Sequence, residues 1–139
     1  MKIYASEIEI ATRGNTDIVD ITDKVAEIIR STDIEMGICL LFTPSSTSGL
    51  TTIEYESGCL QDLKRVFEKI APSTDDYAHN ARWGDGNGHS HVRAALLGAS
   101  VTIPIENHQL MLGTWQQIIL VDFDIRPRRR RLKIQVLGE

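Results

Sequence analysis

Apolar residues recur along the chain with two distinct periods, and the shorter period predicts β-strands. Near the C-terminus, Leu132, Ile134 and Val136 alternate with polar neighbours, which is typical of a strand with one buried face. Residues 37–42 form a continuous apolar run, which is typical of a buried strand. The predicted strands span residues 2–11, 18–19, 37–42, 50–55, 99–105, 108–112, 117–124 and 131–137. The strands at 37–42 and 50–55 flank a polar loop, so they can form a hairpin.

The longer period predicts three helices. The apolar stripes of the first two consist of Val25, Ile28 and Ile29, and of Leu60, Leu63, Val66, Phe67 and Ile70. Pro72 ends the second helix, because proline cannot continue the hydrogen-bond ladder. A short third helix begins at Ser90, whose hydroxyl can cap it, and ends at Gly98. Many strands with two longer helices and one short helix indicate the α+β fold class.

Residues 73–88 form the least regular stretch of the chain. They lack apolar periodicity, and they include Asp75, Asp76, His79 and the segment Asp85–Gly88. A structureless connection of this length is uncommon in a small domain, and such loops often carry function. The stretch therefore becomes the first place to look for a site.

The composition fits one ordinary globular domain over residues 1–139, with 42% hydrophobic and 24% charged residues. The formal net charge of −4 is unevenly spread, because residues 126–133 hold six of the 15 basic residues and no acid. The rest of the chain therefore carries nine basic against 19 acidic residues. This asymmetry favours a local anion site or a solvated edge, and it argues against a nucleic-acid-binding domain.

The cysteines and the N-terminus indicate a cytoplasmic protein. Cys39 and Cys59 have no metal-type spacing, so we expect both to be reduced thiols. The first residues lack the apolar segment of a signal peptide, and no apolar stretch is long enough for a transmembrane helix.

The segment Asp85–His91 holds the most informative chemistry. His89 and His91 lie two residues apart at a predicted helix N-terminus, where free amides and the helix dipole favour an anion. Imidazole can bind a metal, transfer a proton or donate to a phosphate. The alternative is that one histidine caps the helix while the other is solvated.

Two further candidates lie elsewhere in the chain. In Gly113–Gln116, the ring of Trp115 can support a planar ligand and Gln116 can bond its edge, although Trp115 can equally be core. Glu54 follows a predicted strand, where its carboxylate can orient a histidine, although a surface carboxylate is the commoner outcome.

Two segments can bind phosphate. The hydroxyls and amides of Thr43–Gly49 can surround a phosphate, although the loop lacks the glycine-lysine pattern of a P-loop and can be an ordinary turn. In the run Arg128–Arg131, alternate side chains on a strand point to opposite faces, so only some can line one pocket. The alternatives for the run are a phosphate clamp and a solvated hairpin.

These clusters, in this order, resemble one protein family, the YjbQ or UPF0047 family. The resemblance covers essentially the whole chain, and each motif is weak while the ordered set is specific. The matching segments are Thr43–Thr47, Ile53-Glu54, Gly86–His91, Leu96–Gly98, Thr102–Pro104, Gly113–Gln116 and Arg128–Arg131. Two positions depart from the pattern, since Ser45 replaces the usual histidine and Ile53 the usual asparagine.

The resemblance implies a trimeric YjbQ-like β-sandwich and an activity. That activity is thiamine-phosphate synthesis, a transferase reaction that couples a pyrimidine methyl pyrophosphate to a thiazole phosphate and releases pyrophosphate. Trp115 would stack on the pyrimidine and Gln116 would bond its edge. Histidines, helix amides and arginines would stabilise the charge on the leaving pyrophosphate.

The resemblance and the residue chemistry together give a set of expected site residues. We expect Glu54, His89 and His91 to be catalytic, and His79, His89 and His91 to converge as metal ligands with Glu54 nearby. The expected substrate-binding residues are Thr47, Asn87, Ser90, Thr114, Trp115, Gln116, Arg128 and Arg130. Zinc and magnesium are both open as a divalent cofactor. Because a hydroxyl is a weaker ligand than imidazole, Ser45 predicts weaker zinc binding than in relatives with histidine there.

Two other functions remain open at the level of sequence. The first is a binding protein for a phosphorylated metabolite or a divalent metal without turnover, which the change at Ser45 favours. The second is a structural or RNA-associated protein using the arginine run, against which the acidic remainder argues. The expected partners are a phosphorylated small molecule and further copies of the chain, with neither membrane nor nucleic acid.

Overall fold

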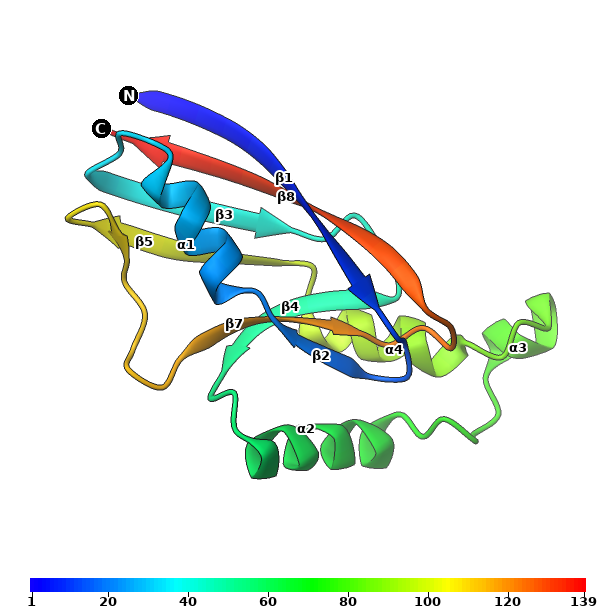
Figure 1. Cartoon of the computed structure of the whole chain (residues 1–139). Helices are drawn as coiled ribbons and strands as arrows, with labels where there is room; N and C mark the ends of the chain where they lie inside the picture. Colours follow the sequence, from blue (N-terminus) through cyan, green and yellow to red (C-terminus); the bar gives the residue numbers. More distant parts are fainter.

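Eight strands and four helices follow one another through residues 1–139 of the computed structural model (Figure 1). The strands are β1 (Lys2–Thr12), β2 (Asp17–Asp20), β3 (Met36–Phe42), β4 (Ser48–Ile53), β5 (Ser100–Glu106), β6 (Gln109–Leu110), β7 (Gln117–Asp122) and β8 (Arg128–Gly138). The helices are α1 (Thr22–Arg30), α2 (Ser57–Ile70), α3 (Ala78–Trp83) and α4 (Gly88–Leu97). None of these helices is both long and apolar enough to span a lipid bilayer.

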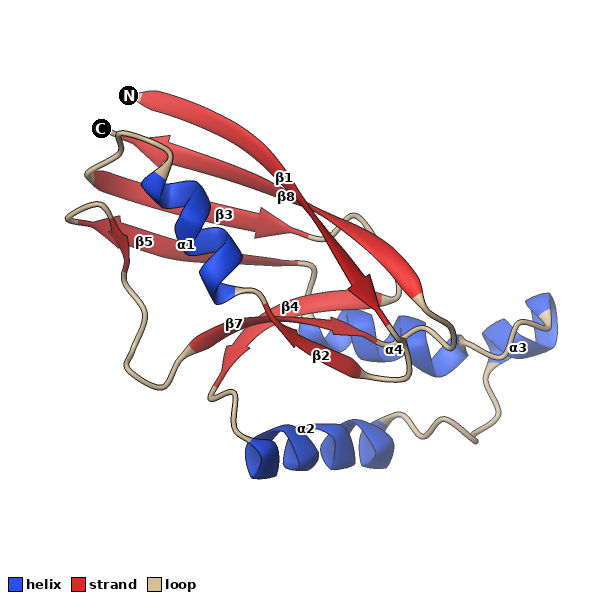
Figure 2. Cartoon of the chain, viewed as in Figure 1, coloured by secondary structure: helices blue, strands red, loops and turns tan.

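The strands form two antiparallel sheets. The larger has the order β1-β8-β3-β5-β6 and the smaller the order β2-β7-β4. β1 and β8 pair along their whole length and curve together toward the smaller sheet (Figure 2). Both ends of the chain lie at the same end of the larger sheet (Figure 1). The short connection of residues 123–127 places the start of β8 next to the end of β7, where the polar side chains of the site gather.

The main core lies between the two sheets and is closed by α1. Alternate residues of β3 and β8 point inward, including Cys39, Leu41, Leu132 and Ile134. They pack with inward residues of the smaller sheet and with the apolar stripe of α1, which are Leu50, Ile118, Leu120, Val25 and Ile29. Because these side chains are at most 1% exposed, the two sheets share one dry interior.

A second core covers the other face of the smaller sheet. Ile119 and Val121 of β7 point away from the main core and pack with Phe67 of α2 and Ala94 of α4. Phe123, which follows β7, meets Phe67 edge to face with ring centroids 4.8 Å apart. The small sheet is thus buried on both faces, which explains the continuous apolar run through β7.

Two sequence expectations differ from the observed fold. β3 and β4 do not form a hairpin, because β3 pairs with β5 and β8 while β4 pairs with β7. The loop between them carries the chain from one sheet to the other. A fourth helix, α3, lies within the stretch predicted to be irregular. It has six residues and buries none of them, so it has no apolar stripe for a pattern to reveal.

The start of α4 also differs from the prediction. The helix begins at Gly88, and Ser90 lies in its first turn, fully buried. The Ser90 hydroxyl donates to the carbonyl of Phe123 and does not cap the helix. This bond ties α4 to the chain that follows β7.

We predict that Phe123 anchors the second core. Phe123→Ala should lower the free energy of unfolding by about 3–5 kcal/mol, because it leaves a cavity between Phe67 and the sheet. Ile125→Ala is the matched control, since Ile125 is 44% exposed and should change stability by less than about 0.5 kcal/mol. Urea denaturation measures both, and equal losses in the two variants would contradict this role.

Candidate functional site

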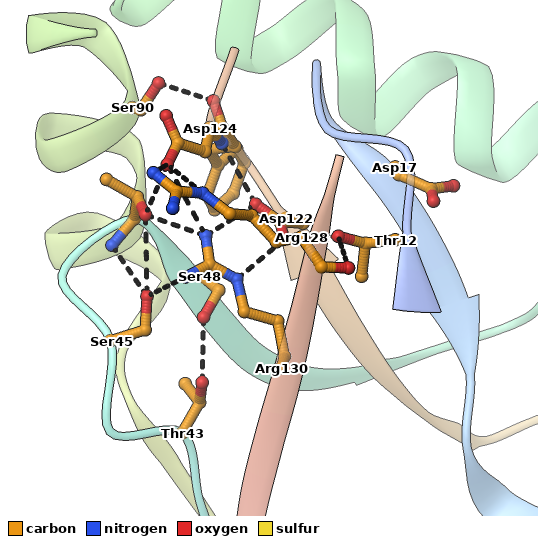
Figure 3. Close-up of polar contacts among 12 residues, drawn as sticks. Thr12, Asp17, Thr43, Ser45, Ser48, Ser90, Asp122, Asp124, Arg128 and Arg130 are labelled. Atoms are coloured by element: carbon orange, nitrogen blue, oxygen red, sulfur yellow. Dashed lines mark hydrogen bonds and ion pairs between the residues drawn. The ribbon is translucent and has the colours of Figure 1, made fainter. Parts of the chain in front are cut away.

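Two buried ion pairs lie where β7 ends and β8 begins (Figure 3). Asp122 is fully buried and accepts from Arg130 at 2.7 Å (Nε to Oδ2) and 2.9 Å (Nη2 to Oδ1). Asp124 is 2% exposed and accepts from Arg128 at 2.9 Å (Nε) and 2.6 Å (Nη2). The Asp122–Arg130 pair has the two-point geometry that suits a guanidinium and a carboxylate, whereas Arg128 donates both bonds to Oδ2 of Asp124.

The strand period of β8 decides which arginines take part. Arg128 and Arg130 point inward, whereas Arg129 points outward, where its side chain is 81% exposed and reaches Glu9. The outward position removes Arg129 from the site, as the period of two requires. Arg128 and Arg130, the two expected substrate-binding arginines, therefore do reach the buried network. However, the aspartates neutralise both, so neither guanidinium remains a free positive charge for a phosphate.

Hydrogen bonds to Asp124 set its charge. Burial alone raises the pKa of this carboxyl group, but the Ile125 amide and the side chains of Arg128 and Asn87 donate to it and outweigh burial. The pKa of Asp124 is therefore held below its usual value, and the side chain is ionised at neutral pH. A charged Asp124 keeps Arg128 in place.

The loop Thr43–Thr47 rests on the Arg130 guanidinium. Nη1 of Arg130 donates to Ser45 Oγ at 2.8 Å, and Nη2 of Arg130 donates to Thr47 Oγ1 at 2.8 Å. The Thr43 and Ser48 hydroxyls bond each other at 2.8 Å across the base of the loop. Figure 3 shows Ser45, Ser48 and Thr43 on the side of the network away from Thr12. The ion pair thus fixes the position of the hydroxyl-rich loop.

A hollow of about 320 Å³ opens between this loop and α4, and we name it the serine–histidine pocket. Its lining is Ser45, Ser46, Ser48, His91, Ala94, Ala95, Gly98 and Ala99. The small residues on the helix side leave the space open, and the polar groups come from the loop and from His91. The pocket therefore has apolar walls with a few convergent polar groups, which is the usual make-up of a ligand site.

Behind His91 lies a second histidine. The ring centroids of His79 and His91 are 4.4 Å apart, and the rings are inclined at 41°. Nδ1 of His79 lies 3.3 Å from Oδ1 of Asp85. α3 thus positions His79, so the helix missing from the sequence prediction supplies one of the residues that the sequence did select.

His89 lies on the other side of α4 and does not join this pair. It is 5% exposed and lines a different hollow with Arg93 and Glu68. Burial lowers the pKa of His89, and the nearby Arg93 charge lowers it further. The prediction that His79, His89 and His91 converge on one pocket is therefore wrong, because residues two apart on a helix face nearly opposite directions.

The residues present do not fit a bound divalent metal. No group of three or more His, Cys, Asp or Glu side chains lies close enough to hold a metal ion. Only His79 and His91 pack together, with their rings inclined at 41°, whereas zinc needs three or four ligand atoms directed at one point. His79, His89 and His91 therefore do not form the expected zinc or magnesium site within one chain.

Glu54 and Gly113–Gln116 lie at the far end of the smaller sheet. The register pairs Ser48 with Asp122 at the network end and Ile53 with Gln117 at the other end. Five strand steps separate these pairs, about 17 Å at 3.3–3.4 Å per residue. Glu54 therefore does not lie near the histidines, and that expectation is wrong.

The expected ring-binding residues share this distant position. Trp115 is 71% exposed, Thr114 is exposed beside it, and Gln116 bonds the Gly113 amide and the Thr52 hydroxyl. Within one chain these side chains and His91 cannot contact one small ligand. The roles given to Glu54 and to Thr114–Gln116 stay predictions from resemblance.

Three other expected substrate-binding residues hold the network together. Asn87 donates to Asp124 at 3.3 Å, Ser90 binds the Phe123 carbonyl, and Thr47 accepts from Arg130. All three are at least 91% buried, so their groups face the protein. Sequence reasoning missed Asp122 and Asp124, although two acids at the end of an apolar strand opposite an arginine run were a usable signal.

We predict that the Asp122–Arg130 pair is required for stability. Arg130→Met should lower the free energy of unfolding by about 3–5 kcal/mol, because it leaves Asp122 buried without a partner. Arg129→Met is the matched control, since its exposed pair with Glu9 is worth at most about 1 kcal/mol. Chemical denaturation of both variants provides the test, and a loss below about 1 kcal/mol for Arg130→Met would refute it.

The chain is similar over its whole length to proteins from archaea. It is 38% identical over 139 residues to a UPF0047 protein of Methanothermobacter thermautotrophicus, covering 100% of this chain and 95% of the relative. It is 39% identical over 131 residues to a UPF0047 protein of Archaeoglobus fulgidus, covering 94% of this chain and 99% of the relative.

Solved structures share the fold. A YbjQ-like protein of unknown function from Sulfolobus solfataricus superimposes with a TM-score of 0.94 at 34% identity, covering 99% of each chain. A YjbQ/UPF0047 protein from Clostridium acetobutylicum gives 0.87 at 32% identity, covering 95% of this chain and 99% of that one. The α+β architecture of antiparallel sheets and helices is therefore confirmed.

These relatives correct the functional expectation. The resemblance implied thiamine-phosphate synthesis, but the relatives carry only the name UPF0047 protein, and the Sulfolobus structure is described as a protein of unknown function. The prediction of a thiamine-phosphate synthase is therefore wrong as a statement of what this family does. The alternative of a non-catalytic metabolite- or metal-binding protein has no support among these relatives either.

The family itself is established by the sequence. A family model described as UPF0047 protein YjbQ-like matches residues 6–139, which is nearly the whole chain. The motifs that carried the resemblance lie within this match, and the curated and structural relatives agree with it. The chain therefore belongs to the YjbQ-like UPF0047 family.

Proposed function

We propose that the chain carries out acid–base chemistry on a small phosphorylated molecule held in the serine–histidine pocket, with His91 as the proton-transfer group. The observation that carries this proposal is that His91 and three serines from a separate segment line one hollow. The hollow of about 320 Å³ is the size of a small-molecule site. Neither metal nor arginine clamp is required.

The surroundings of His91 support a role in proton transfer. Histidine is the side chain whose ordinary pKa lies nearest neutral pH, which suits it to general acid–base catalysis. His79 packs against the ring of His91, and Asp85 lies beside His79. This ring contact limits the orientations that the His91 imidazole can take.

The loop side of the pocket supports a phosphate ligand. Ser45, Ser46 and Ser48 line one wall, and the amide of Ser46 has no acceptor within the protein. Hydroxyls and backbone amides are common donors to phosphate oxygens. The nearest buried carboxylates, Asp122 and Asp124, are neutralised by their arginines and do not repel an anion.

We also propose that the chain forms the homotrimer that the family resemblance implies. The outer face of the larger sheet supports self-association, because its register aligns Ile3, Leu137, Ile38 and Pro104 in one row across four strands. Ile3 is 66% and Ile38 42% exposed, and the helices pack against the inner core and the smaller sheet. An apolar row on an open sheet face is typical of an interface.

For the pocket, we predict that His91→Asn weakens the binding of inorganic phosphate about tenfold, the equivalent of one charge-assisted hydrogen bond. Hydrolysis of p-nitrophenyl phosphate should fall by about two orders of magnitude or more. The chain has four histidines, so their ring signals can be assigned one by one by NMR, and titration with phosphate should shift those of His91 and His79.

The control for this experiment is His108→Asn. His108 is remote from the pocket, and its Nδ1 bonds the Ile34 carbonyl at 2.8 Å. Affinity and rate should stay at the wild-type level in this variant. Unmoved His91 signals would overturn phosphate binding in the pocket, and an unchanged rate in His91→Asn would overturn the proton-transfer role.

For the assembly, light scattering should give three times the 15.6 kDa mass of the chain. Ile38→Lys should dissociate the trimer, because it places a charge in the apolar row. Val66→Lys is the matched control, since Val66 is 47% exposed on α2, away from that face. A wild-type mass of one chain would contradict the trimer, and an intact Ile38→Lys trimer would contradict this interface.

A further inference from the structure

A second hollow, of about 170 Å³, lies on the side of α4 opposite the serine–histidine pocket, and we name it the His89 hollow. Its lining is entirely polar and consists of Asn15, Thr16, Lys64, Glu68, Ser73, His89 and Arg93. These residues come from the β1–β2 turn, from α2 and the segment after it, and from α4. A water molecule occupies about 30 Å³ in the liquid, so the space suits several waters or one small anion.

The wall of the His89 hollow is held rigidly. Arg93 is 4% exposed, and its guanidinium donates to the Ala71 carbonyl at 2.9 Å, to Thr16 Oγ1 at 2.9 Å and to Glu68 Oε2 at 2.7 Å. Thr16 adopts a φ of 63°, which is unusual for a β-branched residue. Its bond to Arg93 helps to hold the backbone in this conformation.

His89, which lines this hollow, carries an unsatisfied polar atom. Its ring is 95% buried, and Nδ1 has no hydrogen-bond partner in the protein. Buried polar atoms are almost always paired, so an orphaned one beside a polar hollow indicates a missing partner. Because burial and the Arg93 charge lower the pKa of His89, its ring is neutral at neutral pH and can still donate one N–H.

The charges in the His89 hollow favour an anion over a cation. The Glu68 carboxylate is already bonded by the Ser73 amide and hydroxyl and by Arg93, which together hold its pKa at about 2. Glu68 and Arg93 therefore cancel. Lys64 forms no ion pair and leaves one positive charge in excess.

We propose that the His89 hollow is a binding site for a small oxyanion, a carboxylate or a phosphate group. Lys64 supplies the charge, while His89, Asn15 and the remaining N–H groups of Arg93 supply directed donors. Carboxylate and phosphate share this recognition chemistry. The site is separate from the serine–histidine pocket, because α4 stands between them and turns His89 away from His91.

The test uses the whole protein and two probes, sodium acetate and inorganic phosphate, followed through the histidine NMR signals. At least one probe should shift the His89 signals and raise the pKa of His89, since a bound negative charge favours the protonated ring. Binding of acetate alone would identify a carboxylate ligand, and binding of phosphate alone would identify a phosphoryl ligand. If neither probe shifts the His89 signals, the proposal is overturned.

Two variants assign the response to this hollow. Lys64→Met should weaken binding at least fivefold, whereas Lys69→Met, on the same helix but outside the hollow, should bind as the wild type does. Wild-type affinity in Lys64→Met would overturn the assigned site. His91→Asn should keep the His89 response, so failure of the serine–histidine pocket and failure of the His89 hollow give different results.

Discussion

The ion pair between Asp122 and Arg130 is the interaction on which the rest of the site depends. It joins the end of β7 to the start of β8, and through the same guanidinium it holds Ser45 and Thr47 of the loop that crosses between the sheets. A buried charge pair is costly unless every donor and acceptor is used, and here hydroxyls and backbone amides complete the set. The arginine therefore builds the pocket wall and does not itself present a free charge to a ligand.

α4 is the second organising element, because it separates two polar hollows. Its bond from Ser90 to the Phe123 carbonyl attaches the helix to the chain after β7. His91 then faces the serine loop, and His89 faces Arg93 and the β1–β2 turn. One short helix thus gives each hollow one imidazole, and the position of α4 fixes both.

Much of the fold was predictable from the sequence, since periodicity located the eight strands and three of the four helices. α3 was not predictable, because it buries no residue and so lacks a stripe. The separation of His89 from His91 was available in principle, since a spacing of two on a helix points side chains apart. It was missed because His89 was placed before the predicted helix start at Ser90, whereas the helix begins at Gly88 and includes both histidines.

The long-range part of the site could not be read from local patterns. The contact of Arg130 with Ser45 and Thr47 depends on how the loop between β3 and β4 crosses to the other sheet, and the placement of Glu54 depends on the register of β4 with β7. Sequence motifs could not give the distances between the residues that they selected. Glu54 and His91, which were grouped in one expected site, therefore lie near opposite ends of β4.

A crystal structure of the protein grown with tungstate, a heavy analogue of phosphate, tests the central claim most directly. The account predicts tungstate in the serine–histidine pocket, within hydrogen-bond distance of His91 and Ser46, with the Asp122–Arg130 pair intact. Tungstate bound instead to Arg128 or Arg130 with the aspartates displaced, or a pocket that stays free of tungstate at saturating concentration, would contradict it.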